Sequence, residues 1–245
     1  WDALEGKVTI LSSMERWDEA VQAVELALKE DPEQPQMLWL KSQPLFDAGQ
    51  YEEAATALQQ AIEITPAATY LYDLGIVRNA QNRFDDALNC FELAIEQDST
   101  DPSNWVQKAS VLRILGRNEE AVLAADRALQ LSPGDSVALV EKSIALAGLD
   151  RAKEAVDAMT EAVEVTRGDA EVLSFKGVMY QLLHRSEEAA VAYRAALDRD
   201  SDQVLSLSGL SGILQERGEL TRAMKLIERA VNLEPEDVQL LGAKA

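Results

Sequence analysis

The sequence predicts an all-α protein, a solenoid of about seven stacked helical hairpins. The first observation behind this prediction is a repeat of alanine every 33 or 34 residues, and each of these alanines is followed seven residues later by another. The first set consists of Ala20, Ala54, Ala87, Ala121, Ala155, Ala189 and Ala223. A period near 34 residues is typical of stacked helix–turn–helix units.

The second observation is the position of glycine and proline within each repeat. We number the positions of one repeat as slots 1 to 34, so that the first repeat shares the chain numbering. Glycine occupies slot 15, where the first helix must stop, as Gly49, Gly116 and Gly218. Proline occupies slot 32, beyond the second helix, as Pro32, Pro66, Pro133 and Pro235. Each repeat is therefore predicted to contain helix A, a tight turn, helix B and a short link.

These boundaries divide residues 1–245 into a single array with no second domain. The expected repeats are 1–34, 35–67, 68–101, 102–135, 136–169, 170–203 and 204–235. Residues 236–245 are expected to begin a partial capping helix that covers the end of the array. No repeat can bury its apolar face alone, so stacking of neighbours must supply the core.

Small and large side chains alternate on the predicted inner faces. In helix A, slot 4 holds leucine or tryptophan, and slot 8 is small in six repeats: Ser42, Gly75, Ala109, Ser143, Gly177 and Ser211. In helix B, slots 20 and 27 are always alanine, and slot 24 is usually large: Leu58, Phe91, Met159, Tyr193 and Ile227. Small residues let helices approach each other, and large residues fill the remaining space.

Composition and charge restrict the class of partner. The chain has 23 basic and 43 acidic residues, a net charge of −20, which disfavours nucleic acid and anionic lipid surfaces. A basic or amphipathic protein partner is expected instead. No apolar run approaches the ~20 residues that cross a bilayer, and the single cysteine cannot form an internal disulfide. We expect a cytoplasmic protein, and the absence of an initiator Met suggests a processed chain or a piece of a longer one.

At these slots the chain resembles the tetratricopeptide repeat family. The resemblance is strongest in repeats 2 to 4, in Leu74-Gly75, in the segments 51–54 and 84–87, and in Trp105. It is weaker in repeats 5 and 6, where Arg167 and Ser201 stand at the expected proline position. The resemblance implies a right-handed superhelix in which helix A residues line a concave groove that binds peptides or extended protein segments.

By analogy with this family, slots 2, 5, 6, 9, 12 and 13 of helix A face the groove. They lie within about 120° on one side of a helix that turns ~100° per residue. The candidate partner-binding residues are Trp39, Leu40, Gln43, Phe46, Tyr72, Ile76, Asn79, Val106, Arg113, Val140, Ile144, Phe175 and Val178. A surface this apolar is typical of a binding site, and Trp39 and Phe46 are the best candidates for anchors. The alternative is that slots 5 and 9 are half-buried against the neighbouring repeat, which would make much of the stripe ordinary packing.

The sequence shows no motif for catalysis, a cofactor or a metal ion. His184 falls in a turn without a histidine or cysteine companion, and Cys90 has no evident activating neighbour. Lysine recurs at slot 7 as Lys7, Lys41, Lys108, Lys142 and Lys176. We hypothesise that these amines lie near carboxylates such as those at slot 19, which is acidic in six repeats, and that the pairs are structural.

Three functional hypotheses remain open at this point. The first is a non-enzymatic scaffold or adaptor that binds an extended or helical protein segment in the groove of repeats 2 to 6. The second is a targeting or substrate-selecting arm of a larger enzyme or envelope assembly complex. The third is a module whose groove is filled by self-association or by its own tail. Specificity in repeat scaffolds lies in scattered side chains, so the sequence does not name the partner.

Overall fold

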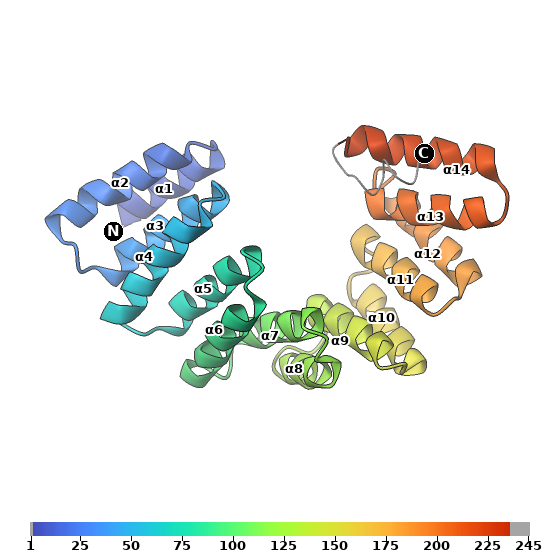
Figure 1. The fold of residues 1–245 in the computed structure, drawn as a ribbon, viewed down its shortest axis with the longest axis horizontal. Coiled ribbons are helices and arrows are strands. Elements are labelled where there is room, and N and C mark those ends of the chain that lie inside the picture. The colour runs from blue at the N-terminus through green and yellow to red at the C-terminus, as the bar shows by residue number, and fades with distance from the viewer. Residues whose placement is uncertain (1, 236–245) are drawn as a thin grey trace. The chain divides into compact units, whose positions relative to one another are not determined.

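The computed structural model describes residues 2–235 and shows fourteen α-helices and no strand in that range (Figure 1). The predicted class, an all-α helical repeat solenoid, is confirmed. The first seven helices are α1 (Asp2–Ser13), α2 (Trp17–Glu30), α3 (Pro35–Asp47), α4 (Tyr51–Ile64), α5 (Ala68–Ala80), α6 (Phe84–Gln97) and α7 (Pro102–Ile114). The other seven are α8 (Asn118–Leu131), α9 (Ser136–Gly148), α10 (Ala152–Val165), α11 (Ala170–Leu182), α12 (Ser186–Arg199), α13 (Val204–Glu216) and α14 (Leu220–Leu233).

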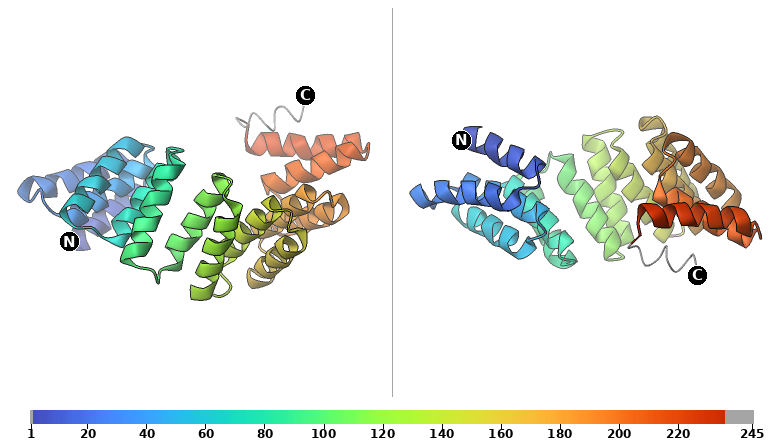
Figure 2. Two further views of the ribbon diagram at one scale, coloured as in Figure 1. Left: turned by 60° about the horizontal axis from the view of Figure 1, so that its bottom comes forward. Right: turned by 90° about the horizontal axis from the view of Figure 1, so that it is seen from above.

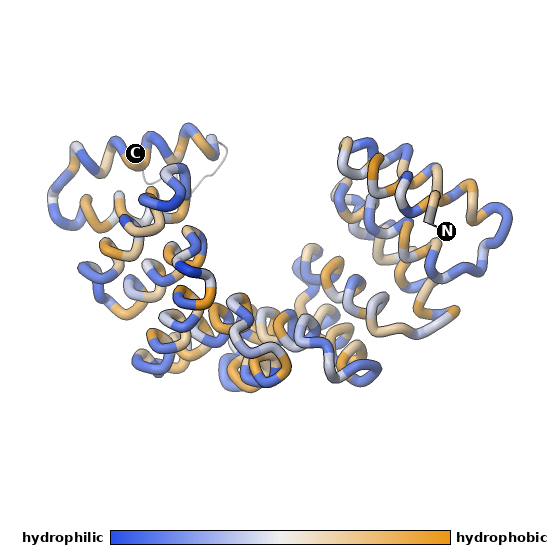
Figure 3. The backbone as a smooth tube through the Cα atoms, turned by 180° about the vertical axis from the view of Figure 1, so that it is seen from behind, coloured by the Kyte–Doolittle hydropathy of each residue, from blue (hydrophilic) through white to orange (hydrophobic). Residues whose placement is uncertain are grey.

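The chain forms two compact units, Trp1–Leu115 and Gly116–Ala245. The periodicity of the sequence does not mark the boundary between Leu115 and Gly116. The division of the chain into seven repeats of one array stays a prediction. The expected capping helix at 236–245 lies outside the described residues. Within each unit, helices that follow one another in the chain pack together, as α3 does with α4 and α11 with α12 (Figure 2). Apolar and polar residues alternate along the helices, as expected for helices that are buried on one side (Figure 3).

The core follows the predicted small-and-large pattern. All seven slot 20 alanines are buried, with at most 6% exposure. The aromatic residues at slot 24 face glycine at slot 8 of the same hairpin. A Cβ atom on Gly75 would lie only 2.6 Å from the ring of Phe91. Where slot 8 is serine, the hydroxyl is satisfied internally, as Ser143 Oγ donates to the carbonyl of Ala155 at 2.7 Å.

The turn between helices A and B has one backbone conformation in all seven repeats. Slot 15 has φ between 55° and 76° whether or not it is glycine, in Glu15, Gly49, Asn82, Gly116, Asp150, His184 and Gly218. In the second repeat, the amide of Gln50 donates to the carbonyl of Leu45 at 2.8 Å, which is the six-residue bond of a Schellman C-cap. His184 is therefore one of these left-handed turn residues.

Three of the slot 7 lysines, Lys41, Lys108 and Lys142, form ion pairs with carboxylates, but at slot 25 of the preceding hairpin and not at slot 19. Lys41 Nζ lies 2.7 Å from Glu25 Oε1, at slot 25 of the preceding hairpin. The slot 19 carboxylate instead binds the arginine three residues earlier, as Glu19 binds Arg16 at 2.6 Å. This bidentate local pair occupies the carboxylate, so the lysine reaches helix B of the neighbouring hairpin.

Candidate protein-interaction site

Within each unit, neighbouring A helices meet along a seam that joins slot 5 of one helix to slot 3 of the next. In the first unit, the rings of Trp39 on α3 and Tyr70 on α5 have centroids 6.3 Å apart. In the second unit, Ser174 Oγ on α11 and Ser206 Oγ on α13 are 2.7 Å apart and buried. Slot 5 side chains therefore contribute to packing between neighbouring hairpins.

This seam corrects part of the predicted groove. Val106 and Val140, both at slot 5, are only 6% and 8% exposed, and Leu40 at slot 6 is 1% exposed. These three side chains are core residues and offer almost no surface to a partner. Slot 5 lies in the seam, whereas Leu40 packs in a cluster with Val8, Leu11 and Val24 of the preceding hairpin.

Four predicted groove residues line one hollow in the first unit, with a volume of about 450 Å³. They are Gln43 and Phe46 from α3 and Tyr72 and Ile76 from α5. The full lining is Ser42, Gln43, Phe46, Asp47, Leu58, Tyr72, Asp73, Ile76 and Val77. We call this the α3–α5 hollow. Its size lies within the ~300–1,000 Å³ range typical of ligand pockets.

The aromatic walls of the α3–α5 hollow are held in place by neighbouring rings. Phe46 packs against Tyr51 at the start of α4, with centroids 5.4 Å apart. Tyr72 meets Phe91 of α6 edge-on at 5.8 Å. Both Phe46 and Tyr72 are half-buried. Each ring packs against a neighbouring ring and leaves part of its surface accessible. Such preorganised aromatic residues are common anchors at interfaces.

Two carboxylates, Asp47 and Asp73, also line the hollow. Asp73 accepts a hydrogen bond from Nε1 of Trp39, which links the seam to the hollow. Burial raises the pKa of Asp73, and the hydrogen bond from Trp39 opposes that rise. Neither carboxylate forms an ion pair with any residue from 2 to 235. The hollow thus combines apolar walls with uncompensated negative charge.

Asp47 and Asp73 were not among the predicted binding residues. They occupy slots 13 and 6, which belong to the predicted groove face. The predicted binding residues on that face were mostly apolar or aromatic, and the two aspartates were not included among them. Their positions at groove slots could have predicted that both side chains face the groove.

The other predicted residues do not join the α3–α5 hollow. Asn79 and Arg113 are half-buried on α5 and α7 of the first unit, and Ile144, Phe175 and Val178 are half-buried in the second unit. Val178 packs against the buried cluster that contains Tyr193. The candidate site is therefore formed by α3 and α5, with Leu58 of α4.

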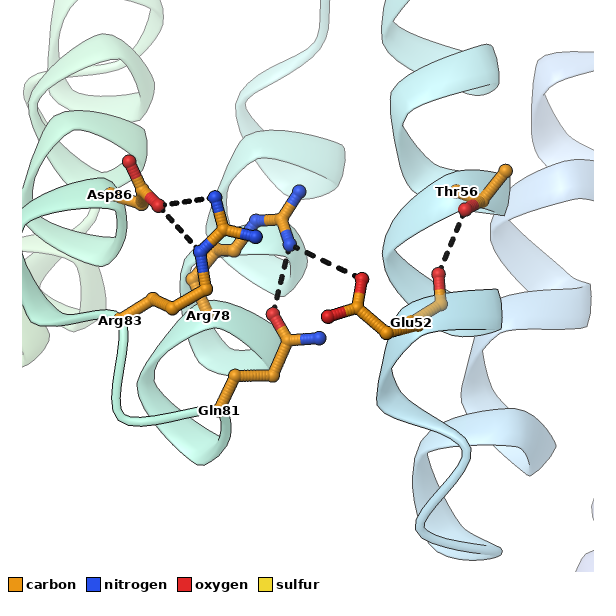
Figure 4. Close-up of polar contacts among 6 residues, drawn as sticks. All are labelled: Glu52, Thr56, Arg78, Gln81, Arg83 and Asp86. Atoms are coloured by element: carbon orange, nitrogen blue, oxygen red, sulfur yellow. Dashed lines mark hydrogen bonds and ion pairs between the residues drawn. The ribbon is translucent and has the colours of Figure 1, made fainter.

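A second hollow of about 360 Å³ lies among α4, α5 and α6 and contains the buried side chain of Arg78. Slot 11 is leucine in five of the other repeats, so a guanidinium here is unusual. Arg78 donates to Gln81 Oε1 at 2.9 Å and lies 3.9 Å from Glu52, while Arg83 binds Asp86 beside it (Figure 4). The charges of this hollow are balanced within the chain, which favours a structural role.

The cysteine in the Arg78 hollow lacks the features of a reactive thiol. Cys90 lines the Arg78 hollow, but burial raises the pKa of its thiol to about 11, and the thiolate is the reactive form. Across residues 2–235, no group of histidine, cysteine, aspartate and glutamate is arranged to hold a metal ion. In the same range, each helix is too short or too polar to span a bilayer.

The hairpin pairs, the small-residue packing and the left-handed turns define a helical-hairpin repeat protein. A family model for the tetratricopeptide repeat matches residues 7–69, 72–136 and 183–238. The chain belongs to the tetratricopeptide repeat family.

Matches to individual proteins are either short or low in sequence identity. A segment of 60 residues is 37% identical to the peroxisomal targeting signal receptor of Candida glabrata, covering 24% of this chain and 10% of that receptor. A tetratricopeptide repeat protein from Parabacteroides merdae aligns with 99% of this chain and 96% of its own at a TM-score of 0.84 and 12% identity. YrrB, a repeat protein with an unusual peptide-binding site, aligns with 77% of this chain and 97% of its own at a TM-score of 0.59 and 24% identity. At these identities the two structures show the shared fold alone.

Proposed function

We propose that this protein is a non-enzymatic interaction scaffold that binds a peptide or helical segment of a basic or amphipathic partner at the α3–α5 hollow. Family membership supports the general function, because tetratricopeptide repeats are typically protein–protein interaction scaffolds. The observation that supports the location is the convergence of Gln43, Phe46, Tyr72 and Ile76 in one hollow. A cytoplasmic adaptor role is part of the proposal.

The chemistry of the hollow fits a protein segment better than a polyanion. Its apolar lining comes from Phe46, Leu58, Tyr72, Ile76 and Val77, which suits burial of partner side chains. The chain carries a net charge of −20, which attracts basic segments and repels phosphate backbones. The apolar lining and the negative charge both favour a basic or amphipathic peptide.

The two alternatives are a targeting arm and self-association. The match to a targeting signal receptor favours a targeting or substrate-selecting arm of a larger protein, although this chain covers only 10% of that receptor. Self-association would place a second copy over the apolar walls. Sedimentation at two protein concentrations separates self-association from binding of a different partner, because only self-association depends on the concentration of this chain.

The proposal can be tested by selecting peptides from a displayed random library on the immobilised protein. Gln43→Arg places a long cation at the exposed edge of the hollow, and Gln60→Arg is the matched control at an exposed site on α4. Selected peptides should bind the wild type and Gln60→Arg equally and should lose most of their binding to Gln43→Arg. Failure to select any peptide, or equal binding to all three proteins, would overturn the proposal.

A further inference from the structure

The α3–α5 hollow holds negative charge that the protein does not neutralise. Its lining contains Asp47 and Asp73 and, among the described residues, no lysine or arginine. The cation nearest in sequence on α3, Lys41, binds Glu25 on α2 at 2.7 Å. Other acids have their own partners, such as Glu19 with Arg16. What distinguishes the hollow is that its two carboxylates lie beside apolar and aromatic walls.

Asp73 keeps spare capacity to accept hydrogen bonds. Its Oδ2 atom accepts from Trp39 Nε1, whereas a carboxylate offers about four lone-pair positions. The side chain is half-buried, and burial disfavours its charged form, as the raised pKa reflects. A cation placed beside Asp73 would relieve this cost and gain a charge-assisted hydrogen bond.

The walls of the hollow suit the stem of a long basic side chain. Phe46, Tyr72 and Ile76 supply apolar and aromatic surface next to the two carboxylates. Lysine and arginine carry three or four methylene groups that pack on such surface while the charged head stays polar. An aromatic wall adds a favourable contact with the cation.

We propose that the α3–α5 hollow receives a single lysine or arginine side chain of the bound segment. The alkyl stem lies along Phe46, Tyr72 and Ile76, and the cationic head is held by Asp47 and Asp73. This inference rests on the proposed function and adds the determinant of its specificity: the partner is a segment that presents one basic residue flanked by apolar residues.

The test uses two blocked peptides and ¹H–¹⁵N spectra of the full chain. The first probe is acetyl-Ala-Leu-Lys-Leu-Ala-amide, and the second carries norleucine in place of lysine, which keeps the stem and removes the charge. The indole N–H signal of Trp39, assigned with Trp39→Phe, reports on Asp73 directly because Trp39 donates to that carboxylate. The lysine peptide should shift this signal and should bind about five- to ten-fold more tightly than the norleucine peptide, as expected for a partly exposed charged hydrogen bond.

Two variants complete the test. Asp73→Asn keeps the shape and the acceptor for Trp39 and removes the charge, so affinity for the lysine peptide should fall about five- to ten-fold. Asp85→Asn, at an exposed site on α6, makes the same change in net charge and should have no effect. Equal binding of both peptides at the hollow would overturn this inference and leave the scaffold proposal intact. Binding of neither peptide at residues around the hollow would overturn the inference, and peptide selection would then decide the scaffold proposal separately.

Discussion

The Nζ atom of Lys41 on α3 lies 2.7 Å from Oε1 of Glu25 on α2 and so joins one hairpin to the next. The same slot 7 to slot 25 pair recurs as Lys108 with Glu92 at 2.8 Å and Lys142 with Asp126 at 2.6 Å. In the third repeat slot 7 is Leu74, and slot 25 of the preceding repeat is the neutral Gln59. Among residues 2–235, the ion pair is therefore a feature of three hairpin junctions and is absent from this one.

This pairing predicts the result of a charge exchange. Lys41→Glu should lower the free energy of unfolding by about 0.5–1 kcal/mol, because it places two carboxylates together at a partly exposed site. Adding Glu25→Lys to that variant should restore most of the loss. Urea unfolding of the two single variants and the double variant measures the coupling. Additive losses would show that the pair contributes nothing to stability.

The close approach of Gly75 to Phe91 predicts a size-dependent defect. Gly75→Ala should destabilise the protein by about 1–3 kcal/mol, because the ring of Phe91 is fully buried and cannot move aside. Phe91→Leu should recover part of this loss in the double variant. Gly212→Ala is the control, since nothing lies within 4 Å of the added Cβ atom, and it should stabilise α13 by up to ~1 kcal/mol. Thermal unfolding that gave the same sign for both alanine variants would contradict this account.

The left-handed turns predict stabilising substitutions. His184 has φ of 55° and Asp150 has φ of 56°, a conformation that costs most non-glycine residues about 1 kcal/mol. His184→Gly and Asp150→Gly should each raise the free energy of unfolding by about 0.5–1 kcal/mol. Gly49→Ala, at φ of 73°, should lower it by a similar amount. Chemical denaturation checks all three, and a loss of stability in both glycine variants would show that these side chains make contacts that outweigh the strain.

Asp73 predicts a dependence of stability on pH. Because burial raises the folded-state pKa of Asp73, its contribution to stability is fully present below the unfolded pKa of ~3.9 and is lost as pH rises through the folded value. Asp73→Asn removes this loss. Unfolding measured at pH 4 and pH 7 should show the variant gaining stability relative to the wild type as pH increases. A gain that shrank toward pH 7 would mean that the bond from Trp39 outweighs the effect of burial.

Much of the candidate site follows from helical periodicity. The groove slots came from the resemblance to the tetratricopeptide repeat family and share one side of helix A, and four residues chosen from them, Gln43, Phe46, Tyr72 and Ile76, line one hollow. Periodicity specifies the face of a helix, but it does not say which edge of that face the next hairpin covers. For this reason Val140 was placed on the groove face and is buried.

The sequence by itself determined the repeat period, the class of fold, the family and the turn positions, because these depend on the spacing of residues along the chain. The tertiary structure decided which carboxylate each lysine binds, that slot 5 packs in the seam, and that Asp47 and Asp73 share a hollow with apolar walls. Such contacts join residues of different hairpins. They depend on the angle and offset at which one hairpin stacks on the next, and the packing of many side chains sets that geometry together.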